Sequence, residues 1–85
     1  MSRAPDLEKA VLDLLDKRAP ATICPSDVAR AVGPEGGWRP LMQPVRDAAA
    51  RLAARGAVEV TQRGKVVDVA TAKGPVRIRR PSTQE

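Results

Sequence analysis

Side chains that can contact nucleic-acid bases occur on one segment in the middle of the sequence. In the major groove of DNA, arginine pairs with guanine and glutamine with adenine through two hydrogen bonds each. Arg39, Gln43 and Arg46 are of these types, and they lie on the outward side of a predicted helix. The segment therefore predicts a surface that can meet the edges of bases.

Further cations suit phosphate oxygens. Arg51 follows on the same predicted helix, and Arg63 and Lys65 flank a glycine in a predicted hairpin turn. The densest positive cluster lies on a predicted final strand, where it suits both phosphate attraction and protection of a sheet edge. The candidate nucleic-acid-binding residues are Arg39, Gln43, Arg46, Arg51, Arg63, Lys65, Arg77 and Arg79.

Three residues of the same helix argue against base-specific recognition. Ala50 and Ala54 leave its outward side poor in hydrogen-bonding groups, and Asp47 would repel a phosphate backbone. General affinity for phosphate is therefore the better supported expectation. An exposed helix that carries arginines is also an ordinary solvated surface, and this alternative stays open.

The net charge of +5 is unevenly distributed along the chain. Residues 1–36 hold five Lys/Arg and six Asp/Glu, a balance of −1, whereas residues 37–85 hold ten and four, a balance of +6. The second half therefore carries all of the positive excess, as expected if it meets a polyanion.

The sequence lacks the residues of common catalytic and metal sites. It has no histidine and a single cysteine, Cys24, so an internal disulfide, an N/S metal site and a Cys–His pair are all excluded. Cys24 is expected to be a small buried apolar residue, and Ser26 to be a helix cap. We expect no enzyme, no cofactor and no metal.

Trp38 is the only aromatic residue. It suits an interface anchor or a stacking platform, but we expect it to fill the core at the start of the third helix, because a small domain without Phe or Tyr needs one large apolar side chain. A single aromatic residue disfavours sequence-specific binding of single-stranded RNA, which stacks bases on several aromatic side chains.

The first third of the chain predicts two helices joined by a short strand. The first helix is capped by Asp6 and ends near Arg18. Residues 22–24 favour a strand. The second, shorter helix is expected to be capped by Ser26 and to end at Gly33.

A third helix is predicted over residues 38–55, with Gly56 just after its end. Pro44 disfavours one continuous helix, so residues 38–43 are expected to form a separate turn, with Pro44 at the first position of the regular helix. On either register, one face is apolar and is expected to be core: Leu41, Val45, Ala48, Ala49 and Leu52.

After Gly56 the pattern changes from helical to alternating. Residues 58–61 predict a strand with one wet face, residues 63–65 a hairpin turn, and residues 66–69 the partner strand. A further strand is expected over residues 76–79.

The element order α-β-α-α-β-β, with the further final strand, is that of a small α+β winged helix, a helix-turn-helix followed by a C-terminal β-hairpin wing. We expect one domain over residues 1–85, with an ordered core over about 6–80. The longest apolar runs are a few residues, and the N-terminus does not look like a signal peptide. A cytoplasmic protein that is not bound to a membrane is therefore expected.

Four segments carry a family resemblance: TICPSDVARAVG (22–33), WRPLM (38–42), TQRGKVVD (61–68) and GPVRIR (74–79). Together they resemble a family of short bacterial proteins classed as a domain of unknown function with a winged-helix-like fold. The resemblance extends from Leu7 to Arg80 and implies this fold without implying an activity. It also implies that some relatives carry a small cysteine-containing module ahead of the domain, which this chain lacks.

Two functions are expected from these observations. The first is a winged helix that binds duplex DNA through phosphate contacts of its third helix and wing. The alternative is a protein-interaction module or homodimer without nucleic-acid binding, in which the alanine-rich outer face of the third helix packs against a partner.

Overall fold

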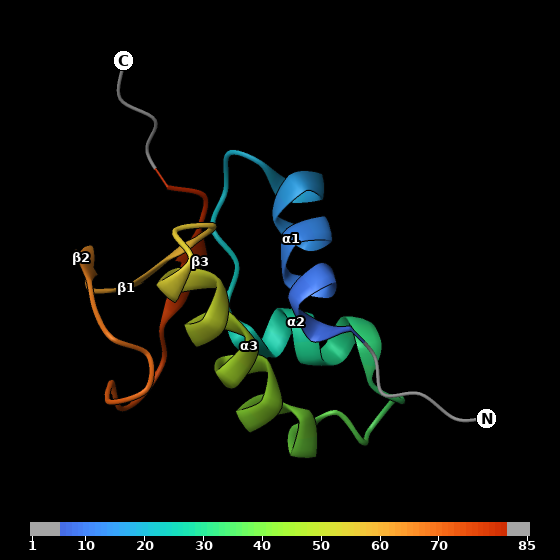
Figure 1. Ribbon diagram of the computed structural model, residues 1–85. Coiled ribbons are helices and arrows are strands. Elements are labelled where there is room, and N and C mark those ends of the chain that lie inside the picture. Colours follow the sequence, from blue (N-terminus) through green and yellow to red (C-terminus); the bar gives the residue numbers. More distant parts are fainter. Residues whose placement is uncertain (1–5, 82–85) are drawn as a thin grey trace.

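A computed structural model describes residues 6–81, which form three α-helices, one 3-10 helix and a three-stranded antiparallel sheet. Figure 1 shows the helices together on one side of the molecule and the strands on the other. This small α+β arrangement, with the sheet after the helices, is winged-helix-like, as predicted. The elements are α1 (Leu7–Arg18), α2 (Pro25–Val32), η1 (Arg39–Leu41), α3 (Met42–Ala54), β1 (Glu59–Gln62), β2 (Lys65–Val66) and β3 (Arg77–Arg79).

The predicted bounds of α1 are confirmed. The Asp6 carboxylate accepts a hydrogen bond of 3.1 Å from the backbone N–H of Lys9, which satisfies one of the free donors of the first turn. Arg18 ends the helix, where a cation favours the negative end of the helix dipole. Val11 and Leu15 form the buried face.

The start of α2 differs from the prediction, because Cys24 and not Ser26 is the N-cap residue. Pro25 occupies the first helical position. Proline fits there because the backbone N–H that it lacks would have no partner within the helix. The Asp27 carboxylate reaches back and accepts a hydrogen bond of 3.0 Å from the backbone N–H of Cys24. Gly33 ends the helix, as expected.

The separate turn predicted before the third helix is confirmed as η1. The predicted position of Pro44 within the helix is wrong by two residues. Since α3 begins at Met42, Pro44 is the third helical residue. Backbone N–H groups of the first turn have no partner within the helix, so proline is tolerated there too. Beyond the last turn, Gly56 has φ +79°, and the N–H of Ala57 donates to the carbonyl of Leu52 at 2.9 Å.

The sheet has the strand order β2-β1-β3, so β1 is central. Arg63 and Gly64 alone join β1 to β2, with φ of 56° and 82°, as in a type I′ hairpin turn. The predicted partner strand over residues 66–69 ends instead at Val66. After Val66 the chain turns away from β1, because the Asp68 carboxylate accepts a hydrogen bond from the N–H of Ala70 at 2.9 Å.

The predicted final strand is confirmed as β3, which pairs with the other edge of β1. Of the predicted strand over residues 22–24, only Ile23 makes a ladder contact, an antiparallel bridge with Ile78. The N–H of Ile23 donates to the carbonyl of Ile78 at 2.9 Å. The segment between α1 and α2 therefore extends the sheet beyond β3.

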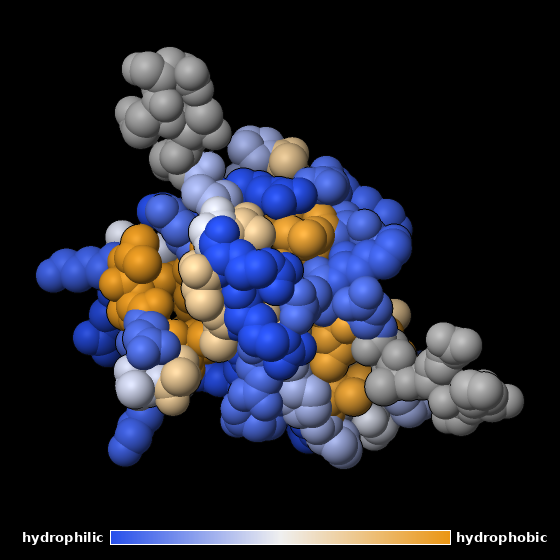
Figure 2. Space-filling view, in the orientation of Figure 1, coloured by the Kyte–Doolittle hydropathy of each residue, from blue (hydrophilic) through white to orange (hydrophobic). Residues whose placement is uncertain are grey.

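The core lies between the helices and the sheet. The expected apolar face of the third helix is buried, with Leu41 partly buried at its edge. The fully buried side chains come from the helices, the sheet and the segment before α2, and include Val11, Ile23, Val28, Ala29, Val45, Ala48, Ala49, Leu52 and Ile78. We call residues 59–79 the wing; its outer edge is β2, over which Figure 2 shows an apolar patch set in hydrophilic surface.

Candidate nucleic-acid interface

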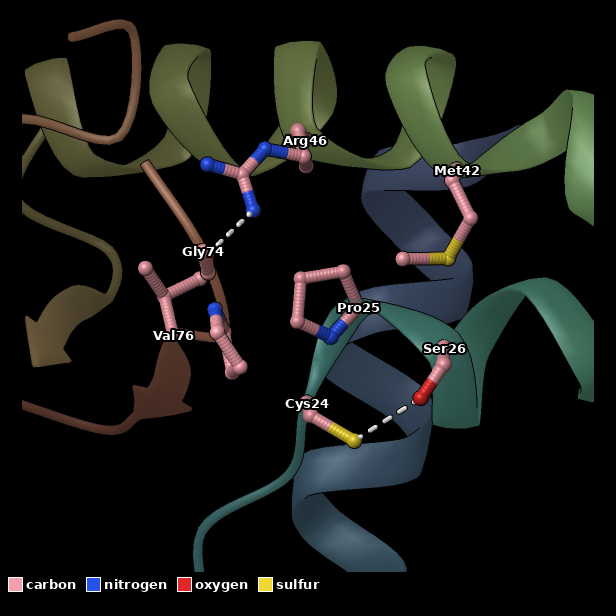
Figure 3. A pocket seen from close by; sticks show the side chains of 8 residues that line it. Cys24, Pro25, Ser26, Met42, Arg46, Gly74 and Val76 are labelled. Carbon is pink, nitrogen blue, oxygen red and sulfur yellow. Dashed lines mark hydrogen bonds between the residues drawn. The ribbon is translucent and has the colours of Figure 1, made fainter. Parts of the chain in front are cut away.

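Arg46 joins α3 to the wing. Its Nη2 donates to the carbonyl of Ala72 at 2.8 Å, and its Nη1 donates to the carbonyl of Gly74 at 3.3 Å. Figure 3 shows the side chain extending from α3 toward Gly74. Within residues 6–81, no carboxylate lies within salt-bridge distance of Arg46. The guanidinium therefore positions the wing and keeps an uncompensated charge.

A hollow of about 400 Å³ lies where α3, the wing and the start of α2 meet. Its wall is mostly apolar, and Met42 and Pro25 face each other across it in Figure 3. The Cys24 thiol and the Ser26 hydroxyl lie 3.0 Å apart at its lower edge. Cys24 is half-buried. The sequence contains no histidine that could act as a base beside this pair.

Three cations form what we call the wing cluster: Arg63, Lys65 and Lys73. Arg63 lies at the tip of the hairpin turn, and the Gln62 side chain holds the opposite loop by donating to the carbonyl of Lys73 at 2.6 Å. Arg63 and Lys73 line a second hollow together with Gly74. Since the Gly74 carbonyl also accepts a hydrogen bond from Arg46, Arg46 contacts the same loop that Arg63 and Lys73 border.

Lys73 is a residue that sequence reasoning missed. It lies in the irregular segment between β2 and β3, where no periodic pattern indicates which side chains point outward. Its position follows from the hydrogen bond between Gln62 and its carbonyl, a contact across 11 residues. A lone lysine in a loop gave no signal by itself.

Three of the predicted residues are engaged within the fold. Arg51 donates to the Glu8 carboxylate of α1 at 2.6 Å, on the side of α3 away from the wing. Arg77 donates to the hydroxyl of Thr22 at 2.9 Å, and Arg79 forms a salt bridge of 2.8 Å with Glu59. The structure therefore does not bring these three arginines into the basic surface around Arg46.

Gln43 and Arg39 lie on the exposed side of α3 and η1, as predicted. The Gln43 amide donates to the Asp47 carboxylate at 2.9 Å, which occupies one of its donors. Of the alanines expected on this side, Ala50 packs against the core and Ala54 is exposed. Apart from Arg39 on η1, the exposed side of α3 is therefore poor in free groups that could read bases.

Trp38 packs against the core at the start of η1, as expected, although it remains partly exposed. Two guanidiniums lie over its ring, that of Arg30 at 4.6 Å and that of Arg39 at 4.7 Å from the centroid. Such cation–π contacts stabilise the cations and cover the ring surface. We call Arg30, Trp38 and Arg39 the Trp38 cluster.

The Glu8 carboxylate connects α1 to the end of α3. Hydrogen bonds from Arg51, at 2.6 Å, and from Arg55, at 2.8 Å, hold the pKa of Glu8 below its usual value. At Asp27, burial raises the pKa, but the hydrogen bonds from Cys24 and the charges of Arg18 and Arg77 outweigh it and lower the pKa. Both carboxylates therefore favour the folded state in their charged form.

Stability is expected to fall in acid as Glu8 is protonated. A carboxyl whose pKa is lower in the folded than in the unfolded state stabilises the fold above the unfolded-state pKa, and this contribution disappears as the pH falls through the folded-state pKa. The urea midpoint of the wild type should decrease below about pH 4.5. Replacing Glu8→Gln should make this decrease shallower.

The control is Glu35→Gln, which removes an exposed carboxylate that has no salt bridge among the described residues. It should follow the wild-type pH profile. Parallel profiles for Glu8→Gln and the wild type would contradict the role assigned to the Glu8 bridge.

No helix among residues 6–81 is long and apolar enough to cross a membrane. The same residues contain no cluster of three or more His, Cys, Asp or Glu side chains that could hold a metal ion.

Comparison with known proteins gives one family. The family model described as "Protein of unknown function (DUF3253)" matches residues 4–81, nearly the whole chain. No curated protein matches the sequence.

Proposed function

Since the chain belongs to DUF3253, a family of proteins of unknown function, we propose a function from its own surface: the domain binds duplex DNA through α3 and the wing. The contacts are mainly to phosphates. Because the proposal requires access to DNA, it includes a location in the bacterial cytoplasm.

The observation that carries this proposal is the distribution of uncompensated charge. Arg46 and the three residues of the wing cluster have no carboxylate within 4.0 Å among the described residues. In contrast, five other arginines are paired with Glu8, Asp16, Asp27 and Glu59. Uncompensated cations therefore remain where α3 meets the wing, while much of the charge elsewhere is neutralised.

This geometry suits the phosphate backbone better than the bases. The major groove is about 12 Å wide and admits a helix such as α3. Arg46 and the wing cluster then reach the flanking phosphates, and such contacts position a protein on DNA without reading sequence. Because Gln43 is bonded to Asp47, we expect weak discrimination between sequences.

The test is the salt dependence of binding to a labelled random duplex, measured by fluorescence anisotropy. The double variant Arg63→Gln/Lys65→Gln is expected to weaken binding and to make the slope of log K against log salt concentration shallower by about 2. The control Lys9→Gln/Lys17→Gln makes the same charge change on the exposed side of α1 and should keep the wild-type slope.

Two outcomes would sink the proposal. One is the absence of wild-type binding at micromolar protein and low salt. The other is an equal loss of affinity in the control variant, since this would show a response to net charge without a defined surface.

A substitution at Arg63 should change the stability of the fold and its affinity for DNA in opposite directions. Its φ of 56° at the tip of a type I′ turn is disfavoured for arginine and well tolerated by asparagine. We expect Arg63→Asn to raise the free energy of unfolding, by up to about 1 kcal/mol, while DNA affinity falls. Chemical denaturation and anisotropy measure the two effects on the same protein.

The matched control is Gly64→Ala, at the neighbouring turn position with φ of 82°. It removes no charge and forces a side chain into the left-handed region, so it should lower stability and leave the affinity of the folded protein unchanged. Unchanged affinity in Arg63→Asn would remove this arginine from the proposed interface.

The proposal is of a binding protein without catalytic activity or cofactor. The Cys24–Ser26 pair is the nearest approach to a nucleophile, and the adjacent Asp27 carboxylate is occupied by the backbone N–H of Cys24 and by Arg18. Neither contact activates a thiol or a hydroxyl, because a nucleophile needs a free base beside it.

The alternative, homodimerisation without nucleic-acid binding, has one favourable observation. Val66, on the edge strand β2, is 60% exposed. The flanking Arg63 and Lys65 would repel those of a second copy, which favours DNA as the partner. Sedimentation equilibrium tests this alternative: a strict monomer over a wide concentration range would exclude the homodimer.

A further inference from the structure

A second cluster of uncompensated cations lies near the start of α3, where α2 ends and η1 begins. Arg30, near the end of α2, and Arg39, at the start of η1, both lie over the Trp38 ring and are exposed. Among residues 6–81, neither guanidinium forms a salt bridge, and Glu35 on the intervening turn pairs with neither.

The indole ring holds the two arginines without using their hydrogen-bond donors. Each guanidinium has five N–H donors along its edge, whereas a cation–π contact uses its flat face. No hydrogen bond from either guanidinium to the described part of the protein is present. The donors therefore point to solvent from side chains whose freedom is already reduced, which lowers the entropy lost when an anion binds.

We infer that the Trp38 cluster is a second phosphate-binding site, which holds phosphodiester oxygens of the same duplex DNA beyond the N-terminal end of α3. This inference rests on the proposed function. Arg30 and Arg39 donate to the phosphates, and Trp38 is a positioning residue that holds both guanidiniums. Base stacking on Trp38 is disfavoured because the guanidiniums cover its ring.

The position of the cluster supports simultaneous contact with the wing cluster. Arg39 and Arg46 are seven residues apart on nearly the same side of η1 and α3, which separates their backbones by roughly 10 Å along the axis. A helix in the major groove lies within it, so this separation would place Arg39 and Arg46 beside different phosphates of the duplex. We therefore expect the Trp38 cluster and Arg46 to contact different stretches of phosphate.

The test uses Arg30→Gln/Arg39→Gln in the anisotropy titration described above. We expect a salt slope shallower by about 2 than that of the wild type, a loss equal to that of Arg63→Gln/Lys65→Gln. Lys9→Gln/Lys17→Gln is again the charge-matched control. Circular dichroism checks that each variant is folded.

Two further measurements probe the stacking itself. Trp38 is the only aromatic residue, so its fluorescence reports on this site alone, and its emission should change with DNA concentration along the anisotropy curve. Arg30→Lys/Arg39→Lys keeps both charges but loses the planar fork, so it should bind less tightly than the wild type.

The failures of the two ideas are distinguishable. If no variant and no wild-type protein binds DNA, the proposed function fails and this inference fails with it. If Arg63→Gln/Lys65→Gln weakens binding while Arg30→Gln/Arg39→Gln keeps the wild-type affinity and slope, the proposed function stands and the second site is overturned. Unchanged Trp38 emission at saturating DNA would also overturn it.

Discussion

Replacing Ile78→Ala is expected to lower the free energy of unfolding by about 4 kcal/mol. Ile78 is fully buried, pairs with Val60 of β1 and bridges Ile23 on its other side. Its truncation therefore leaves a cavity at the junction of the sheet with the segment between the first two helices. A domain of this size has a total stability of roughly 4–13 kcal/mol, so this loss removes between about a third and all of it.

The measurement is urea denaturation followed by Trp38 fluorescence and by far-ultraviolet circular dichroism. Ile78→Val keeps most of the side-chain volume and should cost about 1 kcal/mol. Val66→Ala removes an exposed apolar side chain and should change stability little. An Ile78→Ala midpoint equal to that of Ile78→Val would show that the site collapses around the smaller side chain.

Replacing Gly33→Ala is expected to cost about 3 kcal/mol, because a methyl group has no room there. A Cβ atom at this position would lie 2.9 Å from the carbonyl oxygen of Ala29 and 3.0 Å from the Cα of Trp38. Both are backbone atoms, so the end of α2 would have to move away from η1. The same change would disturb the Trp38 cluster, which bridges these two elements.

The control for Gly33 is a second glycine of the same turn. Gly36 has φ +77° and no neighbour within 4 Å, so Gly36→Ala meets conformational strain without a clash and should cost about 1 kcal/mol. Chemical denaturation compares the two variants. Equal losses would mean that close packing at Gly33 contributes nothing beyond the ordinary constraint on a turn.

Local signals in the sequence were sufficient for most of the fold. Asp6 and Gly56 mark helix ends because capping depends on nearby backbone groups, and the alternation after Gly56 predicts β1 because one face of the strand is buried. The predicted N-cap residue of α2 was wrong because cysteine is not a usual cap residue. There, Pro25 and the carboxylate of Asp27 determine where the helix begins.

The candidate site was harder to predict, because charge alone does not show which cations remain unpaired. Arg51 and Arg79 have the same side-chain chemistry as Arg46, yet their partners Glu8 and Glu59 are 43 and 20 residues away in the sequence. Such pairs depend on how the elements pack. The contact of Arg30 with Trp38 could likewise not be predicted from the sequence, since the two residues belong to different elements.

The bridge between Ile23 and Ile78 has a consequence for how the protein is made. Together with the bond from Arg77 to Thr22, it joins segments 55 residues apart. As the chain leaves the ribosome, the helices can form early, but the sheet cannot close until β3 has emerged. Such distant pairing slows folding. Until then, one side of β1 is an open strand edge, and the nascent chain is most exposed to mispairing at that stage.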